Sequence, residues 1–180
     1  MKAVVFLVLI LAVIVLAVFL LQESPLQPKP AENLSAGHIY VSWDTMEFDK
    51  CVAAWLITRF IDRDAQFVFV PSNTEITEGR PFDIPGAQWS RKHRKCTSQC
   101  ILESMDNPDP AIERIVTMAS RTELNFWQLD RWPQTQKYFY EVKEIMDQAG
   151  DPLVCLEKTN VYFDRLYSDF KANGSAESAD

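Results

Sequence analysis

An uninterrupted run of 19 apolar residues, from Ala3 to Leu21, begins this chain of 180 residues. A helix of that length, rising 1.5 Å per residue, nearly spans a bilayer core of about 30 Å. The run continues directly into Gln22 and Glu23 without the small-residue cleavage site that ends a typical signal peptide. The sequence therefore predicts a transmembrane signal anchor over residues 1–22, with a cleaved signal peptide as the alternative.

The charges on either side of the apolar run predict its orientation. Lys2 and the N-terminal amine precede the run, whereas Glu23, Lys29 and Glu32 follow it and sum to −1. The positive-inside rule then places the N-terminus in the cytoplasm and the rest of the chain outside. We expect a single-pass protein of the bacterial inner membrane, with its folded domain in the periplasm.

Proline content and polarity divide the remainder of the chain. Residues 23–37 contain three prolines among small and polar residues, a composition typical of an extended linker. A folded domain is expected over residues 38–170. Residues 171–180 are small, polar and acidic, which indicates a flexible tail.

The chain beyond the apolar run is strongly acidic. The chain has 18 Lys and Arg against 25 Asp and Glu, so without Lys2 the balance is 17 against 25, or −8. A surface of that charge repels nucleic-acid phosphates, and nucleic acid is therefore not an expected partner. The membrane is the partner indicated by the apolar run, and the sequence identifies no protein partner.

The domain pattern indicates a few short strands followed by about four or five helices, which is an α+β domain. Apolar, β-branched and aromatic runs predict strands at residues 39–43 and 66–70, with at most a short third strand near residues 82–84. Helical spacing and capping residues predict helices over residues 50–61 (capped by Asp49), from Cys96 through Met105, after Asp109-Pro110, from Pro133 to Gly150, and around residues 161–170.

Several sequence blocks, taken in order, resemble the C-terminal domain of the chromate-resistance protein ChrB. The blocks are residues 55–62 (WLITRFID), 65–71 (AQFVFVP), 81–87 (PFDIPGA), 96–97 (CT) and 161–167 (VYFDRLY). The resemblance covers roughly residues 38–170 and implies a role in chromate resistance. It also marks Trp55, Arg59, Asp62 and Asp83 as residues of the family blocks.

The chain departs from the family pattern where chemistry would be expected. In relatives a Cys-Pro pair precedes the Trp of the first block, whereas this chain has Ala53 and Ala54 at those two positions. Relatives have Phe-Glu after Cys-Thr, and here the Glu position is Gln99. The family His falls at Arg91, while His93 lies two residues later. The resemblance thus implies the fold but transfers no complete catalytic motif, and whether the chain is an enzyme stays open.

A dense basic run inside this acidic domain is the main candidate site. Arg91, Lys92, Arg94 and Lys95 lead directly into the predicted helix start at Cys96. A helix N-terminus offers free N–H groups, and Arg and Lys side chains suit tetrahedral oxyanions. We predict an oxyanion site at these four cations. The alternative is a solvated basic loop, or one that pairs with the surplus carboxylates.

His93, Cys96 and Cys100 follow one another at spacings that allow metal ligation, so the one cofactor indicated is a metal ion. The same two cysteines are the predicted redox pair. Cys51 and Cys155 lie in apolar stretches typical of core positions, although an oxidising compartment would also allow disulfides of undetermined connectivity.

The leading functional hypothesis is a membrane-anchored domain outside the cytoplasm that binds or senses an oxyanion or a metal stress. One alternative is a thiol-dependent redox enzyme that acts on chromate or another oxyanion through Cys96 and Cys100. The other is a tethered interaction module without catalytic function.

Overall fold

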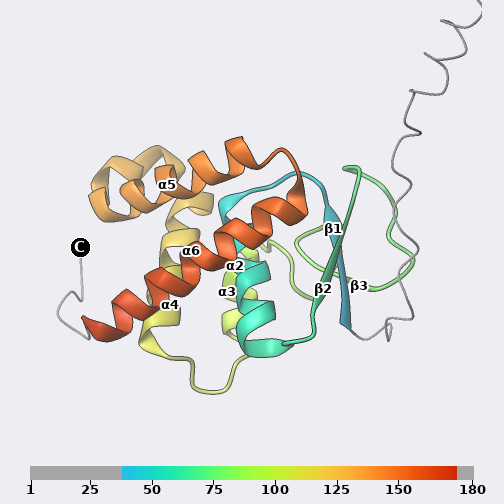
Figure 1. Cartoon of the computed structure of the whole chain (residues 1–180), viewed down its shortest axis with the longest axis horizontal. Helices are drawn as coiled ribbons and strands as arrows, with labels where there is room; N and C mark the ends of the chain where they lie inside the picture. Colours follow the sequence, from blue (N-terminus) through green and yellow to red (C-terminus); the bar gives the residue numbers. More distant parts are fainter. Residues whose placement is uncertain (1–37, 174–180) are drawn as a thin grey trace, which may run out of the picture. The chain divides into compact units, whose positions relative to one another are not determined.

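The computed structural model describes residues 38–173, which form a small sheet packed against helices (Figure 1). The predicted α+β class is confirmed. In chain order the elements are β1 (Ile39–Trp43), α2 (Phe48–Leu56), η2 (Ile57–Ile61), β2 (Gln66–Val70), β3 (Arg80–Pro81), α3 (Thr97–Leu102), α4 (Pro110–Leu124), η3 (Phe126–Arg131), α5 (Pro133–Ala149) and α6 (Pro152–Ala172).

The predicted anchor at residues 1–22 and the predicted linker at residues 23–37 lie outside the described residues, as does the end of the predicted tail. Between residues 38 and 173, no helix has both the length and the apolar character needed to cross a membrane. The last helix, α6, continues to Ala172. The first two residues of the predicted tail are therefore helical.

The sheet has the strand order β2-β1-β3, and both pairings are parallel. The strands predicted at residues 39–43 and 66–70 are confirmed with those bounds. The third strand lies at residues 80–81, because Asp83 has φ +54°, a left-handed conformation that an extended strand does not accommodate. Parallel strands place their carboxyl ends at one edge, which is where open sheets flanked by helices commonly bind ligands.

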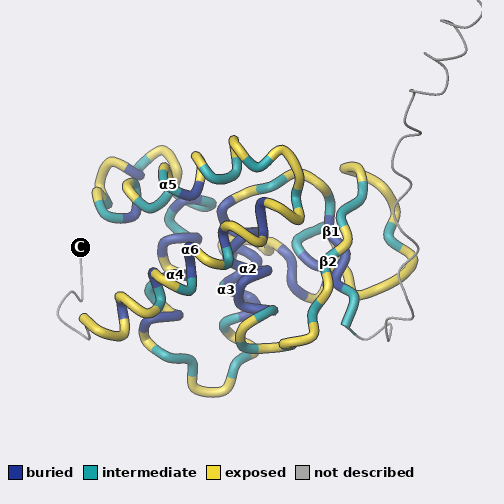
Figure 2. Tube along the Cα trace, in the orientation of Figure 1, coloured by how far each residue is buried: buried dark blue, intermediate teal, exposed yellow. Residues whose placement is uncertain are grey.

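Helix α2 is the centre of the core. Every residue from Phe48 to Leu56 is buried (Figure 2), and the helix contacts α3, α4 and α6. The ring of Trp55 packs against Phe60, Phe163 and Tyr167, with ring centroids 5.2–5.9 Å apart. A helix that is buried on all sides is usually apolar throughout. This one is unusual because it also buries charged residues near its start, Asp49 and Lys50.

The beginning of α2 corrects one prediction. The helix begins at Phe48, and Asp49 lies inside its first turn instead of capping it. The side chain of Asp49 reaches α3, as described below. At the other end, the α-helical pattern gives way to the π-helical turn η2, where the Asp62 N–H donates to the Ile57 carbonyl at 2.8 Å.

Helices α4 and α5 begin where predicted. The last helix was predicted around residues 161–170 and begins earlier, at Pro152, while α3 ends at Leu102, before the predicted Met105. Asp109 accepts the Ala111 N–H at the start of α4. Helix α5 begins at Pro133 and ends before Gly150, whose φ of +68° suits glycine. Asp151 then caps α6 by accepting the N–H groups of Leu153 and Val154 at 2.8 and 3.1 Å.

Candidate functional site

The basic run forms a tight turn before α3. The Lys92 N–H donates to the Lys95 carbonyl at 3.0 Å, and the Lys95 N–H donates back to the Lys92 carbonyl at 3.1 Å. Arg94, inside the turn, has φ +67°. Residues 91–94 are exposed, so the side chains of this turn face solvent.

Two of the four cations already form ion pairs with carboxylates. Arg91 donates from Nη2 to Glu123 Oε2 at 2.9 Å, and Lys95 Nζ lies 2.6 Å from Glu103 Oε1. Within residues 38–173, the side chains of Lys92 and Arg94 form no hydrogen bond or ion pair. The pairing alternative from the sequence therefore holds for Arg91 and Lys95, whereas Lys92 and Arg94 stay available.

A pocket of about 250 Å³ opens between the basic turn and α3. It brings together two of the four predicted cations and one of the predicted thiols. The lining residues are Gln88, Trp89, Lys92, Lys95, Cys100, Glu103 and Ser104. Arg91 and Arg94 do not line this pocket.

The N-terminus of α3, which the sequence favoured for an oxyanion, is already occupied by Asp49. One carboxylate oxygen of Asp49 accepts the Thr97 N–H at 2.6 Å, and the other accepts the Ser98 N–H at 3.1 Å. Asp49 is only 4% exposed. An added anion would meet this buried carboxylate, so the helix start does not serve as the predicted anion site.

The two predicted redox cysteines differ in environment. Cys96 is fully buried, and burial, followed by repulsion from Asp49, raises the pKa of its thiol to about 12. Burial also raises the pKa of Cys100, against the opposing effect of Lys92, and its thiol donates to the Ser90 carbonyl at 3.5 Å. Both residues are free thiols, and neither is poised as a thiolate.

The predicted metal ligands do not converge. His93 is exposed on the turn, whereas Cys96 and Cys100 are buried. In the described part of the chain, these three residues do not form a group whose ligand atoms lie within 4.8 Å of one another. That arrangement is found instead for His38, Asp62 and Asp64.

In that other group, Nδ1 of His38 lies 2.8 Å from both carboxylate oxygens of Asp62. Asp62 also accepts the Asp64 N–H at 3.1 Å. Hydrogen bonding to His38 lowers the pKa of Asp62, although partial burial acts in the opposite direction. Asp62, a family-block residue, thus joins the start of β1 to the end of η2.

Cys51 and Cys155 are core residues, as their apolar surroundings indicated. They are 0% and 1% exposed and lie on the packed helices α2 and α6. A hydrogen bond between the two thiols raises the pKa of Cys51 and lowers that of Cys155. Both are free thiols.

Two family-block residues stabilise the junction with α6. The Trp55 indole N–H donates to Asp164 Oδ1 at 2.9 Å. Arg59 donates to both oxygens of the same carboxylate, from Nε at 2.9 Å and from Nη2 at 2.8 Å. Such a bidentate pair between η2 and α6 indicates a structural role for Trp55 and Arg59.

A buried charged network lies at the carboxyl edge of the sheet. It includes Asp83, which the sequence analysis had marked only as a family-block residue. Lys50, 3% exposed, donates from Nζ to the carbonyls of Trp43 and Thr45 at 2.8 and 2.6 Å. Its Nζ also lies 3.6 Å from Asp83 Oδ2. The other oxygen of Asp83 accepts the Thr97 hydroxyl at 2.5 Å. This network joins β1, α2, the segment after β3 and the start of α3.

Two carboxyl groups of this region titrate near neutrality. Burial, followed by repulsion from Asp49, raises the pKa of Asp83 to about 6. The same two causes, with a further contribution from Glu47, raise the pKa of Glu123 to about 7, against the attraction of Arg91. Groups with such pKa values exchange protons at physiological pH and are common at functional sites.

The sequence revealed neither Asp49 and Lys50, which contact Thr97 and Asp83 of this network, nor the raised pKa of the nearby Glu123. Asp49 has the residue type and position of a helix cap, and that interpretation concealed its long-range partner. One signal was present, namely two adjacent charged residues directly before the apolar stretch Cys51–Trp55. Charges in the first turn of a helix that is otherwise entirely apolar indicate burial with partners.

A comparison with protein-family models matches residues 40–170 to the family described as ChrB, C-terminal domain. No curated protein and no solved structure matched the chain. The matched residues include β1 except Ile39, the basic turn and all but the last two residues of α6.

Proposed function

Starting from the fact that this chain belongs to the family of ChrB C-terminal domains, we propose that its domain binds a tetrahedral oxyanion of the chromate and sulfate class. The observation that carries the proposal is the pocket in which Lys92 and Lys95 converge beside Cys100. Lys92 has no partner in the described part of the chain and offers a full charge to an anion. Two ammonium groups, with Gln88 and Ser104 as neutral donors, suit an oxyanion of charge −2.

The carboxylate of Glu103 also lines this pocket and holds Lys95 in an ion pair whose side chains are 43% and 51% exposed. Exposed pairs of this kind contribute at most about 1 kcal/mol. An oxyanion can therefore replace Glu103 as the partner of Lys95 at small cost, and Glu103 acts as an internal competitor.

Binding is favoured over thiol redox chemistry. Reduction of an oxyanion by cysteine requires a thiolate, and burial raises the pKa of both Cys96 and Cys100. Only Cys100 lines the pocket, because Cys96 is fully enclosed. In this proposal Cys100 only forms part of the pocket wall, because its S–H donates to the Ser90 carbonyl.

The test is calorimetric titration of the full chain, in a non-ionic detergent, with chromate, sulfate and phosphate. The substitution Lys92→Gln is expected to weaken binding about tenfold, the effect of one charge-assisted hydrogen bond. Glu103→Gln is expected to strengthen binding several-fold, because it removes the competing carboxylate.

The matched control is Arg94→Gln, which removes a cation from the same turn without touching the pocket. It is expected to change the affinity less than twofold, as an exposed charge outside the pocket is largely screened. Equal losses for Lys92→Gln and Arg94→Gln would show only a diffuse effect of positive charge. The absence of binding by all three anions would refute the proposal.

We also propose that residues 1–22 anchor the domain at the periplasmic face of the inner membrane. The support is the apolar run Ala3–Leu21 and the charge difference across it. Alkaline phosphatase fused to the C-terminus is expected to be active, and green fluorescent protein at the same position dark. The converse pair of results would place the domain in the cytoplasm.

A further inference from the structure

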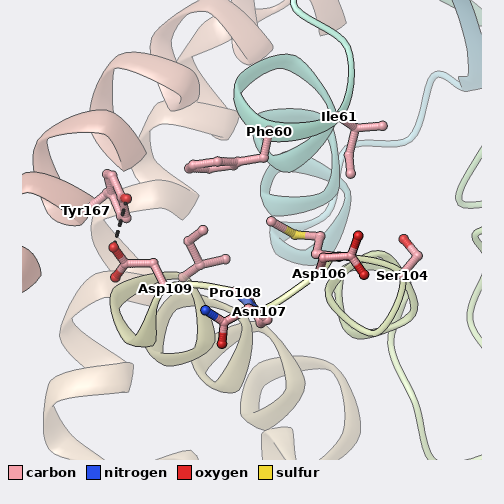
Figure 3. A pocket seen from close by; sticks show the side chains of 10 residues that line it. Phe60, Ile61, Ser104, Asp106, Asn107, Pro108, Asp109 and Tyr167 are labelled. Atoms are coloured by element: carbon pink, nitrogen blue, oxygen red, sulfur yellow. Dashed lines mark hydrogen bonds between the residues drawn. The ribbon is translucent and has the colours of Figure 1, made fainter.

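A larger pocket, of about 490 Å³, lies between η2, the loop after α3, the start of α4 and the C-terminal part of α6 (Figure 3). Its apolar lining consists of Phe60, Ile61, Met105, Pro108 and Ile112, and its polar lining of Ser104, Asp106, Asn107, Asp109 and Tyr167. The volume is within the range of small-molecule sites, which combine apolar walls with a few polar groups. Ser104 is the one lining residue that this pocket shares with the pocket of the oxyanion proposal.

The ionisable groups of the lining are acidic. Asp109 and Asp106 contribute carboxylates, Tyr167 contributes a phenol, and none of the ten lining residues is basic. Figure 3 shows Asp109 beside Tyr167 at one end and Asp106 beside Ser104 at the other, with apolar side chains between them. A ligand for this site therefore needs a hydrocarbon body and positive charge.

Two of the lining residues, Asp109 and Tyr167, already contact an ammonium group, that of Lys171, which does not itself line the pocket. Lys171 Nζ lies 3.2 Å from Asp109 Oδ2 and 5.2 Å from the centroid of the Tyr167 ring. The Tyr167 hydroxyl donates to the same carboxylate oxygen at 3.2 Å. A carboxylate next to an aromatic face is a standard environment for an organic cation. Lys171 is 53% exposed, so a ligand ammonium can displace it at small cost.

The other end of the pocket has no internal cation. Asp106 is exposed, and within the described residues its carboxylate forms no ion pair or hydrogen bond. A ligand that spans the pocket would pair one ammonium with Asp109 and a second with Asp106. Its carbon chain would lie on Phe60, Met105 and Ile112.

We propose that this pocket binds a short aliphatic diamine, held by Asp109 and Tyr167 at one end and by Asp106 at the other. The acidic charge of the domain, with 15 Lys and Arg against 21 Asp and Glu over residues 38–170, or −6, attracts such cations from solution. No residue of the basic turn lines this site, and the proposal involves no covalent chemistry.

The experiment is calorimetric titration of the full chain in a non-ionic detergent with 1,4-diaminobutane. Two ligands with the same four-carbon chain serve as comparisons. They are n-butylamine, which has one ammonium group, and butane-1,4-diol, which has none. We expect butylamine to bind about fivefold more weakly than the diamine, and the diol not to bind, because each ammonium supplies one ion pair.

Two variants change the pocket in opposite directions. Asp106→Asn is expected to weaken diamine binding about fivefold without changing butylamine binding, whereas Lys171→Gln is expected to strengthen both severalfold. Asp130→Asn is the matched control, because it removes another exposed carboxylate, which lies on η3 and does not line the pocket. Failure of 1,4-diaminobutane to bind, equal affinities of Asp106→Asn and Asp130→Asn, or binding of the diol as tightly as the diamine would each overturn the proposal.

Discussion

Replacement of Asp49 by alanine is expected to lower the free energy of unfolding by about 4 kcal/mol. Its carboxylate accepts the N–H groups of Thr97 and Ser98 in a buried setting, and hydrogen bonds to a charged group contribute about 1.5–3 kcal/mol each. Alanine leaves both N–H groups buried without partners. Urea denaturation followed by tryptophan fluorescence measures the effect, and Asp49→Asn, which keeps one acceptor, is expected to lose about half as much.

The chain offers a matched control for this substitution. Asp151 also accepts two backbone N–H groups at the start of a helix, but it does so in exposed surroundings. Asp151→Ala is expected to cost about 1 kcal/mol, because water satisfies the released N–H groups. Equal losses for the two alanine variants would mean that burial does not strengthen the Asp49 contacts.

The second expected result is a loss of stability of about 5 kcal/mol as the pH rises from 4.5 to 8. The pKa values of Asp83 and Glu123 are raised to about 6 and about 7, from 3.8 and 4.5. Between the unfolded and folded values, the folded chain binds more protons than the unfolded chain. Stability therefore falls as the pH rises through this interval, and is highest on its acidic side.

The variant with Asp83→Asn and Glu123→Gln is expected to remove most of this pH dependence, as neither replacement ionises. Urea midpoints at closely spaced pH values provide the measurement. The control pair, Asp130→Asn and Glu113→Gln, changes exposed residues of the same types and is expected to keep the wild-type slope. A slope of the opposite sign in the wild-type chain would contradict the raised pKa values.

The sequence predicted those parts of the fold that depend on local signals. The strand Ile39–Trp43 and the helix starts at Pro110 and Pro133 depend on β-branched content, caps and proline, and all three are confirmed. The parallel strand order could not be predicted, because it depends on contacts between segments far apart in the chain. The π-helical turn η2 has an ordinary helical pattern in its sequence, and its packing alone distinguishes it.

The distinction between local signals and long-range contacts applies to the candidate site as well. A run of basic residues is visible in the sequence, and the structure places Lys92 and Lys95 of that run on one pocket. What the sequence did not show is which cations are neutralised, since Glu103 and Glu123 lie 8 and 32 residues away from their partners. The pocket proposed for the diamine was likewise not visible, because its residues come from three separated segments with no common motif.

The contact between Asp49 and the start of α3 has a further consequence for how the chain folds. It joins residues 48 positions apart, and closing a loop of that length costs on the order of 3 kcal/mol in chain entropy. Helix α3 has only six residues, too few to persist alone in water. Its formation must therefore coincide with the docking of α2 and of the intervening strands β2 and β3. The segment from α2 to α3 consequently behaves as one cooperative unit, in which no part is stable before the loop is closed.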